Sequence, residues 1–462
     1  MLRVMDDEPE EPLNINVTVR RKIIMTRDKE LERVAQDKSC ATPRMAFILS
    51  QFPLVDETFI LREMTALAEA GFDFDLYVFK KSPRTVVQQA AQKLMPRLIY
   101  RRYFWSWEVL AAQFHFLRCA APAYFGTLFI FIAELWKHPK ILAKGLALFP
   151  KAVCYARLMQ QRQTVHVHAF WATFPCNIAW IAHRLLGVPF SFSAHAHDLY
   201  EYECMVGRKL SAASFVMTCT QYNLGYLSKL VPEKKHAVKL IYHGQNLAPY
   251  REDAKHREPP GKVFRILSIG TFYKTKGFDT LIAACAILKQ QGFPFQCKIV
   301  GDGREREQLE RLITKHALQE HVTLLGYLPQ EEIRPLRRWA NVFILLPRPY
   351  LHWGLPNVFI EALASQLPVI ATPLNAIGEL IKHEETGLIV ESDKPEAAAA
   401  AIIRMQREPE LRERMTDAGQ KMVLQLFDER RTSAQLCGLF AERVPRQEST
   451  REAKAVHEEI VD

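Results

Sequence analysis

The chain has 462 residues, of which 48% are hydrophobic and 24% charged, a globular composition with room for two domain cores. Its net charge of +10 favours anionic partners, which include nucleic acid, an acidic membrane surface and phosphorylated ligands. The nine cysteines are scattered without a CxxC pair, which argues against a disulfide scaffold and structural zinc, so we expect reduced thiols in a cytoplasmic protein.

The first clear elements begin at Met45. Residues 1–44 are polar and mixed in charge, so we interpret them as an N-terminal extension, and their acidic start does not resemble a signal peptide. MAFILS predicts a buried strand, the apolar spacing from Ile60 to Ala68 predicts a helix, and LYVF predicts a second strand. The order strand, helix, strand indicates a βαβ unit.

The next segment is rich in bases and aromatics. Arginines and aromatic residues between 97 and 107 are followed by an apolar stretch from Cys119 to Leu135. This stretch is shorter than the roughly 20 residues that span a bilayer, and Pro122 and Gly126 interrupt it. Shallow insertion of amphipathic helices into an anionic membrane, ordinary core helices and a spanning helix stay open as alternatives.

Strands and helices alternate from His166 onward. VHVHAF, a helix near 176–186 and VPFSFSA complete a first domain over 45–245, and the polar, proline-containing segment 246–262 predicts a linker. FRILSIG, FQCKIV, VTLLG, VFILLP, PVIAT and GLIV then predict strands separated by helices over 263–426. We therefore expect an α/β protein with two Rossmann-like, doubly wound parallel-sheet domains facing a central cleft, followed by a C-terminal helix and polar tail over 427–462.

Several loops that follow predicted strands carry polar or glycine-rich motifs. In GTFYKTKG, Gly270 and Gly277 permit close approach of a ligand, and Lys274 and Lys276 offer charge for phosphate, although a solvated basic turn explains the loop equally well. In VGDG, the glycines on both sides of Asp302 predict a tight turn beside a flat ligand.

The stretch HWGLPNVFIEALA predicts a helix N-terminus that faces a ligand. After Gly354, Leu355 and Pro356, the free N–H groups of Asn357 and Val358 suit a diphosphate. Glu361 lies one turn into the helix, where a carboxylate can hold the hydroxyls of a ribose. These features predict a nucleotide-diphosphate pocket, and the absence of GxxxxGK[ST] and GxGxxG argues against a P-loop or a dinucleotide site.

Histidines follow the predicted strands of the first domain. SAHAHDLY places His195 and His197 after a strand, where imidazoles can contact hydroxyl groups and act as acid or base. The alternative for each of them is a structural role in the core, with the ring nitrogens hydrogen-bonded inside the protein. Convergence of His166, His168, His195 and His197 on a metal is not expected, since HxH pairs on strands point into one layer.

From about Met45 to Phe440 the sequence resembles the retaining family-4 glycosyltransferases of the GT-B fold, in the subgroup that builds bacterial exopolysaccharides of the colanic-acid type. The resemblance rests on SQFPLVDETFILRE, VPFSFSAHAHD, ILSIGTFYKTKGFDTLI, KIVGDGRERE, VTLLGYLPQEE and GLPNVFIEALASQLPVIAT, which occur in the family's order. It implies catalytic roles for His195, Lys276 and Glu361. It further implies donor contacts at Gly270, Thr271, Gly301, Asp302, Tyr327, Leu328, Trp353, Gly354, Leu355, Asn357 and Val358, and acceptor-side contacts at Glu57, Thr58, Arg62 and His197.

The sequence departs from the family at three positions. Trp353 stands where the first acid of the E-x7-E motif is expected, Thr271 where an arginine joins the lysine, and Phe170 where a histidine ends the strand. Arg348 or Lys274 is a candidate replacement for the missing arginine. In the front-face reaction that the resemblance implies, the leaving diphosphate takes the acceptor proton, so positioning and electrostatics matter most.

The resemblance therefore implies a retaining hexosyltransferase that moves sugar from a UDP- or GDP-sugar to a growing saccharide or a lipid-linked acceptor. We expect no cofactor or metal, no nucleic-acid partner, and a cytoplasmic location with peripheral contact to the inner face of an anionic plasma membrane. The alternative is a catalytically weakened scaffold that assists another transferase, and a nucleotide-sugar epimerase of the same fold is a third hypothesis.

Overall fold

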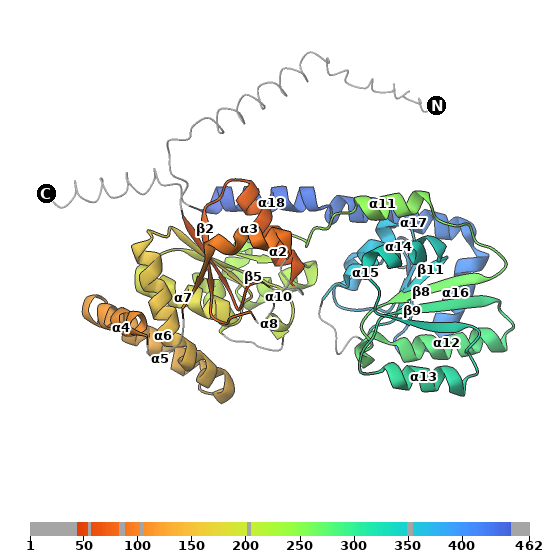
Figure 1. The fold of residues 1–462 in the computed structure, drawn as a ribbon, viewed down its shortest axis with the longest axis horizontal. Coiled ribbons are helices and arrows are strands. Elements are labelled where there is room, and N and C mark those ends of the chain that lie inside the picture. The colour runs from red at the N-terminus through yellow and green to blue at the C-terminus, as the bar shows by residue number, and fades with distance from the viewer. Residues whose placement is uncertain are drawn as a thin grey trace, which may run out of the picture. The chain divides into compact units, whose positions relative to one another are not determined.

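The computed structural model describes residues 44–53, 57–82, 88–101, 106–200, 205–348 and 354–444. The residues from 44 to 445 cluster as one compact unit, and they carry two sheets in which every strand pair is parallel (Figure 1). The predicted α/β class with two doubly wound parallel sheets is therefore confirmed.

The first sheet has seven strands. In spatial order they are β3 (Leu98–Tyr100), β2 (Phe74–Val78), β1 (Met45–Leu49), β4 (His166–Phe170), β5 (Phe190–Ala194), β6 (Phe215–Thr218) and β7 (Val238–Leu240). Alternate residues of β1 enter two different cores, with Ala46 and Ile48 on one face and Phe47 and Leu49 on the other. All five residues of β1 are buried, as expected for a central parallel strand.

Helices cover both faces of this sheet. They are α2 (Thr58–Glu69), α3 (Gln89–Leu94), α4 (Trp107–Cys119), α5 (Ala121–Leu135), α6 (Pro139–Gln161), α7 (Phe174–Leu186), α8 (His197–Tyr200), α9 (Val206–Ala212) and α10 (Gln221–Leu230), with the 3-10 turns η1 (Met95–Arg97) and η2 (Pro232–Ala237). The predicted apolar face of α2 is buried at Ile60, Leu61, Met64 and Leu67, whereas Ala68, at its end, is only partly buried.

The second sheet has six strands and its own core. In spatial order they are β10 (Val322–Gly326), β9 (Phe295–Val300), β8 (Phe264–Ile269), β11 (Val342–Leu345), β12 (Val369–Ala371) and β13 (Leu388–Ile389). The accompanying helices are α11 (Ala248–Lys255), α12 (Phe278–Gln290), α13 (Arg306–Lys315), α14 (Gln330–Trp339), α15 (Asn357–Ala364), α16 (Pro395–Arg407) and α17 (Pro409–Leu426), with η3 (Lys274–Lys276) and η5 (Ile377–Glu379). The predicted linker 246–262 contains α11, which packs against α14 and α15.

The last described helix, α18 (Glu429–Arg443), packs against α2 of the first sheet. Its Leu436, Leu439 and Phe440 belong to the same buried cluster as Phe47 and Phe215, and the Phe440 ring lies 5.4 Å from the Phe215 ring. The first sheet therefore completes one of its cores with residues from the end of the chain.

Helices α4 and α5 stand at the periphery of the first sheet, next to α6 (Figure 1). In the described part of the chain no single helix has the length and apolarity of a membrane span. The pair α4 and α5 passes that test only when taken together, and it bends by 111° between Cys119 and Ala121.

Each sheet has one point where the strand order reverses. In the first sheet the chain moves outward from β1 to β3 and returns at β4, and in the second it moves from β8 to β10 and returns at β11. Ligands of doubly wound sheets bind at the carboxyl ends of the strands beside such a reversal. The loops after β1 and β4 in the first sheet, and after β8 and β11 in the second, are therefore where binding residues are expected.

Candidate functional site

The loop after β8 lies against the loops after β9 and β11. Gly277 has a left-handed backbone (φ +70°), and a Cβ there would collide with the carbonyl of Leu346. Gly301 follows β9, and a Cβ at that residue would collide with the carbonyl of Gly270. Glycine is thus needed at both positions, because the backbones of neighbouring loops approach so closely that no side chain fits between them.

Lys276 ends the short turn η3 in this loop and is half-buried. Burial lowers the pKa of Lys276 to about 8. A phosphate group beside the ammonium would offset this desolvation, so the lysine is suited to an anionic ligand. Lys274 and Thr271 of the same loop are exposed.

Arg348 does not replace the missing arginine, contrary to the hypothesis from sequence. Its Nε donates to Asp393 (2.7 Å), one terminal nitrogen contacts Asp279 (2.9 Å), and the other donates to the carbonyl of Lys274. The guanidinium is thus engaged on every nitrogen, and it ties the loop after β11 to the loop after β8. Lys274 keeps its place as the other candidate.

The start of α15 has the predicted geometry. Pro356 is the capping residue and provides no side-chain hydrogen bond, and the helix begins at Asn357. The N–H groups of Asn357 and Val358 are therefore available at the end of the helix that carries partial positive charge. Gly354 and Leu355 are partly exposed in front of this helix, and Trp353 lies outside the described residues.

Glu361 is buried on α15. Burial raises the pKa of its carboxyl, while Arg337 and hydrogen bonds from Tyr250 and Gln330 oppose the rise. One terminal nitrogen of Arg337 lies 3.6 Å from a Glu361 oxygen. Two carboxylate oxygens provide about four acceptor positions, so these partners leave capacity for a ligand's hydroxyl groups.

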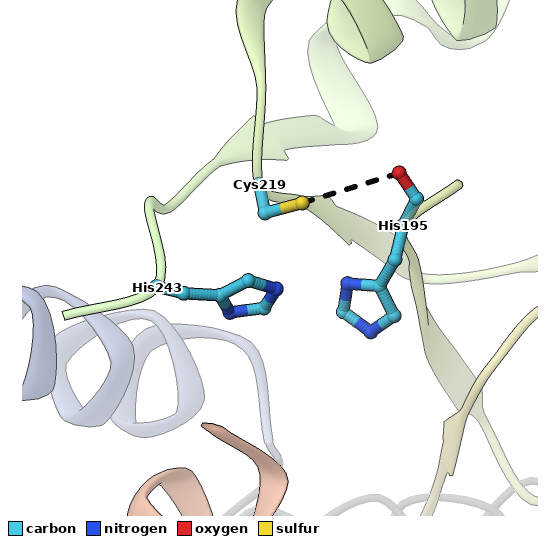
Figure 2. Close-up of side chains that lie close together, drawn as sticks. All are labelled: His195, Cys219 and His243. Carbon is cyan, nitrogen blue, oxygen red and sulfur yellow. Dashed lines mark hydrogen bonds between the residues drawn. The ribbon is translucent and has the colours of Figure 1, made fainter. Parts of the chain in front are cut away.

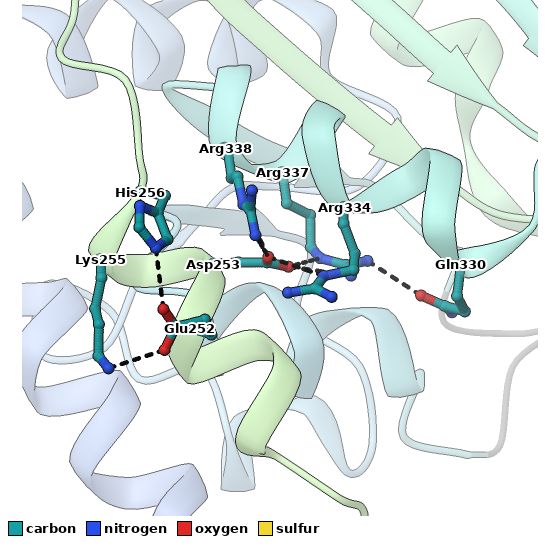
Figure 3. Close-up of polar contacts among 8 residues, drawn as sticks. All are labelled: Glu252, Asp253, Lys255, His256, Gln330, Arg334, Arg337 and Arg338. Carbon is teal, nitrogen blue, oxygen red and sulfur yellow. Dashed lines mark hydrogen bonds and ion pairs between the residues drawn. The ribbon is translucent and has the colours of Figure 1, made fainter.

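Asp253 of α11 holds Arg337 from the other side (Figure 3). Its carboxylate is fully buried and lies within 3.4 Å of Arg334, Arg337 and Arg338, all of α14. Figure 3 shows Arg337 passing from this carboxylate to Gln330. A chain of charged groups thus links the segment before the second sheet to Glu361.

Three further donor residues of the prediction, Asp302, Tyr327 and Leu328, lie at the same edge of the second sheet. Asp302 is exposed and accepts a hydrogen bond from the N–H of Gly303 (2.8 Å). Tyr327 is exposed to 84% of its surface, whereas Leu328 packs partly against the core. The structure therefore gathers the predicted donor residues that it describes around the carboxyl ends of β8, β9, β10 and β11.

In the first sheet, His195 follows β5 and is buried by aromatic rings. Its ring centroid lies 4.7 Å from that of Trp171, 4.9 Å from that of His243 and 5.0 Å from that of Phe59. Neither ring nitrogen has a hydrogen-bond partner among the described residues, and burial lowers the pKa of His195 to about 4. At neutral pH the imidazole is therefore uncharged, with one donor and one acceptor to offer.

His195, Cys219 and His243 point toward one another in Figure 2, and their ligand atoms lie within 4.8 Å of one another. Zn²⁺ bonds of about 2.0–2.3 Å require ligand atoms less than about 4 Å apart in a tetrahedral site. The two imidazole rings are inclined by 41° at 4.9 Å, which is a partly stacked arrangement. These residues could hold a metal only after the cluster contracts, and the expectation of a metal-independent protein stays a prediction.

The loop that carries His195 is organised by Asp198. The buried carboxylate accepts hydrogen bonds from the N–H groups of Ala172 (2.9 Å), His195 (3.1 Å) and Ala196 (2.8 Å). It therefore joins the end of β4 to the end of β5 and fixes the backbone of His195. His166 and His168, in contrast, are core residues of β4 that hydrogen-bond Ser191 at 2.7 and 2.8 Å.

The acceptor-side residues of the prediction fall into two groups. The exposed His197 ring lies 4.5 Å from Trp171, beside the His195 cluster. Thr58 and Arg62 line a groove of about 970 Å³ together with residues of α3, α11 and α18. Glu57 precedes α2 as its capping residue.

Sequence reasoning missed four residues around His195, which are Phe59, Glu63, Trp171 and His243. Trp171 directly follows β4 and His243 follows β7, so the rule that points to post-strand loops would have found both. Glu63 lies within α2, where only the fold reveals that it reaches Nδ1 of His243 at 3.3 Å.

Glu63→Gln should stabilise the protein at high pH. Burial raises the pKa of Glu63 from 4.5 to about 7, so the folded state retains a proton that the unfolded state loses. The free energy of unfolding of the native protein should therefore fall as pH rises from 4.5 to 7, by about 3 kcal/mol at most. Urea denaturation should find Glu63→Gln more stable than the native protein at pH 8 but not at pH 4.5, and equal midpoints at pH 8 would contradict the burial of a titrating carboxyl.

The comparisons with known proteins agree with this architecture. The model of the family "Glycosyl transferases group 1" matches residues 250–422. The amylovoran biosynthesis glycosyltransferase AmsK of Erwinia amylovora is 26% identical over 393 residues, which cover 78% of this chain and 90% of AmsK. WcaL of Salmonella typhimurium, named as a candidate colanic acid biosynthesis glycosyltransferase, is 24% identical over 420 residues, which cover 86% of this chain and 99% of WcaL.

Solved structures share the fold. HepE of Anabaena, crystallised with UDP, superimposes with a TM-score of 0.61 at 16% identity and covers 87% of this chain and 100% of its own. The sucrose-phosphate synthase of Thermosynechococcus elongatus gives a TM-score of 0.61 at 20% identity, with 87% and 98% covered. The resemblance to the exopolysaccharide glycosyltransferases is confirmed: residues 250–422 match the glycosyl transferases group 1 model, and the chain has the GT-B fold.

Proposed function

We propose that the protein transfers a hexosyl group, with retention, from a UDP- or GDP-sugar to a growing saccharide or a lipid-linked saccharide in exopolysaccharide biosynthesis. The observation that carries the proposal is the position of Glu361. It lies one turn behind the uncapped N-terminus of α15, beside the reversal of strand order between β8 and β11. The named role of AmsK in amylovoran biosynthesis and the UDP complex of HepE support this class of reaction.

In this proposal the second sheet binds the donor. Lys276 and the N–H groups of Asn357 and Val358 contact the diphosphate, and Glu361 accepts the ribose hydroxyls. Asp302, Tyr327 and Leu328 lie on the side of the base. Leaving-group charge develops on the diphosphate during transfer, so donors that are already oriented there lower the barrier.

The first sheet holds the reacting sugar and the acceptor. The neutral His195 imidazole, whose nitrogens lack partners among the described residues, suits a hydroxyl of the donor sugar. His197, Thr58 and Arg62 contribute on the acceptor side. The departing diphosphate takes the acceptor proton, so the reaction needs neither a protein nucleophile nor a bound metal, and it takes place in the cytoplasm beside the membrane.

A nucleotide screen tests the donor site. Binding of UDP or GDP, alone or in a sugar conjugate, should raise the thermal midpoint of the purified protein, since a ligand at about 100 times its Kd adds about 2.7 kcal/mol. Glu361→Gln and Lys276→Gln should each weaken binding about 10- to 100-fold, the loss expected for one charge-assisted contact. Affinity should also fall as pH rises above 8, because Lys276 then loses its charge.

Glu413→Gln and Lys315→Gln, at exposed positions on α17 and α13, are the matched controls and should bind like the native protein. Normal nucleotide binding by both site variants would overturn the assignment of the pocket. Isothermal titration of the same proteins gives the affinities directly.

The scaffold hypothesis is the second candidate. Thr271 presents no charge where the family has an arginine, and Arg348 is engaged by Asp279 and Asp393. Nucleotide binding without turnover by the pure protein, together with co-purification of an active transferase, would favour this alternative. Turnover by the pure protein would exclude it.

A further inference from the structure

Helix α5 carries an exposed apolar stripe that glycosyl transfer does not explain. Phe125, Phe129, Ile132 and Trp136 follow one another at steps of four, three and four residues, so they lie on one face of the helix. Their exposed fractions are 58%, 72%, 40% and 64%. Large apolar side chains on one unpartnered face usually mark an interaction surface.

The opposite face of α5 is anchored in the protein. Thr127, Phe131 and Leu135 are buried, and the helix packs against α6 and α7. A side chain at Gly145 of α6 would meet the Phe131 ring, so the two helices approach closely. The stripe is therefore presented on a firmly packed helix.

Basic residues continue the stripe along the chain. Lys137 follows Trp136 directly, with its ammonium 5.8 Å from the centre of the indole ring, and Lys140 and Lys144 are exposed on the first turns of α6. The acids nearby are already paired, since Glu134 lies 2.6 Å from Arg208. The surface is thus apolar with a positive border.

Helix α4 adds to the exposed apolar surface. Trp107 and Phe114 lie seven residues apart on one face and are exposed to 79% and 68%. The only acid of α4, Glu108, lies 2.8 Å from Arg101. Since Glu108 pairs with Arg101 and Glu134 pairs with Arg208, the other charged side chains of α4, of α5, of the turn that follows it and of the start of α6 are positive, namely Arg118, Lys137, Lys140 and Lys144.

We propose that the exposed faces of α4 and α5, together with Lys137, Lys140 and Lys144, form a docking surface for an anionic lipid bilayer. Aromatic side chains beside lysines suit the boundary between headgroups and acyl chains, where the rings insert and the ammonium groups meet phosphate. Protein–protein interfaces are, in contrast, depleted in lysine. This inference rests on the proposed function, because a lipid-linked acceptor resides in a membrane. Its test, however, needs no transferase activity.

Co-sedimentation with vesicles tests the surface. The native protein should bind vesicles of phosphatidylglycerol and phosphatidylcholine, should bind pure phosphatidylcholine weakly, and should be released by high salt. Replacement of Phe125, Phe129 and Trp136 by Ser should lower the partition coefficient about 100-fold or more. Replacement of Lys137, Lys140 and Lys144 by Gln should lower it about 100-fold for the anionic vesicles alone.

The control variants carry changes of the same kind elsewhere on the surface. Leu230→Ser with Val263→Ser removes exposed apolar groups, and Lys235, Lys315 and Lys421 replaced by Gln removes the same charge. Both should bind vesicles like the native protein. All variants should keep the native thermal midpoint and should show the native increase in that midpoint when nucleotide binds. Vesicle binding and nucleotide binding are thus measured separately, so an error in the proposed docking surface can be told from an error in the proposed donor site.

Three results would overturn the proposal. They are a native protein that does not sediment with anionic vesicles, stripe variants that sediment as the native protein does, and a native dimer that becomes monomeric in the aromatic variant. The last result would assign the surface to a second copy of the chain.

Discussion

Asp253→Ala should lower the free energy of unfolding by about 3–5 kcal/mol, the loss that follows when one partner of a buried ion pair is removed. The carboxylate is fully buried and compensates three arginines, of which Arg337 is itself buried. Its removal leaves a guanidinium without a counter-charge in the protein interior. Since Arg337 also contacts Glu361, nucleotide affinity should decrease together with stability.

Urea denaturation and nucleotide titration check this result, with Glu252→Ala as the matched control. Glu252 neighbours Asp253 on α11, but its side chain is 46% exposed and pairs with Lys255 and His256 (Figure 3). The control should leave both stability and affinity unchanged. An apolar double variant, Asp253→Leu with Arg337→Met, should recover stability but not affinity. Recovery of both would contradict the positioning of Glu361 by Arg337.

Asp198→Ala should cost about 4 kcal/mol or more, because three backbone N–H groups lose a charged acceptor in a buried site. The ends of β4 and β5 would then lose their connection, and the backbone of His195 would no longer be fixed. We expect a lower urea midpoint and, in a transfer assay, a larger loss of turnover than of donor affinity.

Glu233→Ala, at an exposed position in η2, is the control and should behave like the native protein. Asp198→Asn retains one acceptor oxygen and should fall between the native protein and Asp198→Ala in stability. A native midpoint for Asp198→Ala would show that the loop does not depend on this carboxylate.

Periodicity and loop chemistry in the sequence were enough to predict most of the fold. Every residue of β1 is buried, as its unbroken apolar run predicts, and α12 lies between β8 and β9, where the sequence predicts a helix between two strands. The predicted donor residues that the structure describes share one edge of the second sheet, because parallel strands place all their following loops on the same side. Periodicity and loop chemistry were therefore sufficient to predict the site residues that directly follow a strand.

The remaining features depend on contacts between distant segments, which a single sequence does not reveal. Glu63 has no local signal, because only the approach of the loop after β7 makes it a neighbour of His243. The sequence made Arg348 a candidate for phosphate binding, but the structure shows its guanidinium bound to Asp279 and Asp393. The polar composition of residues 246–262 concealed a helix whose buried Asp253 binds three arginines.

The return of α18 to the first sheet has a consequence for protein engineering. Leu436 and Phe440 complete the core that contains Phe47 and Phe215, although Phe440 lies 393 positions after Phe47 and 225 after Phe215 along the chain. A fragment that stops near residue 245 would expose this core and should aggregate when expressed alone. A chimera that exchanges the nucleotide-binding half for that of a relative should therefore keep residues 428–444 with their own first sheet. Such a chimera needs two crossover points, one near residue 245 and one just before residue 428.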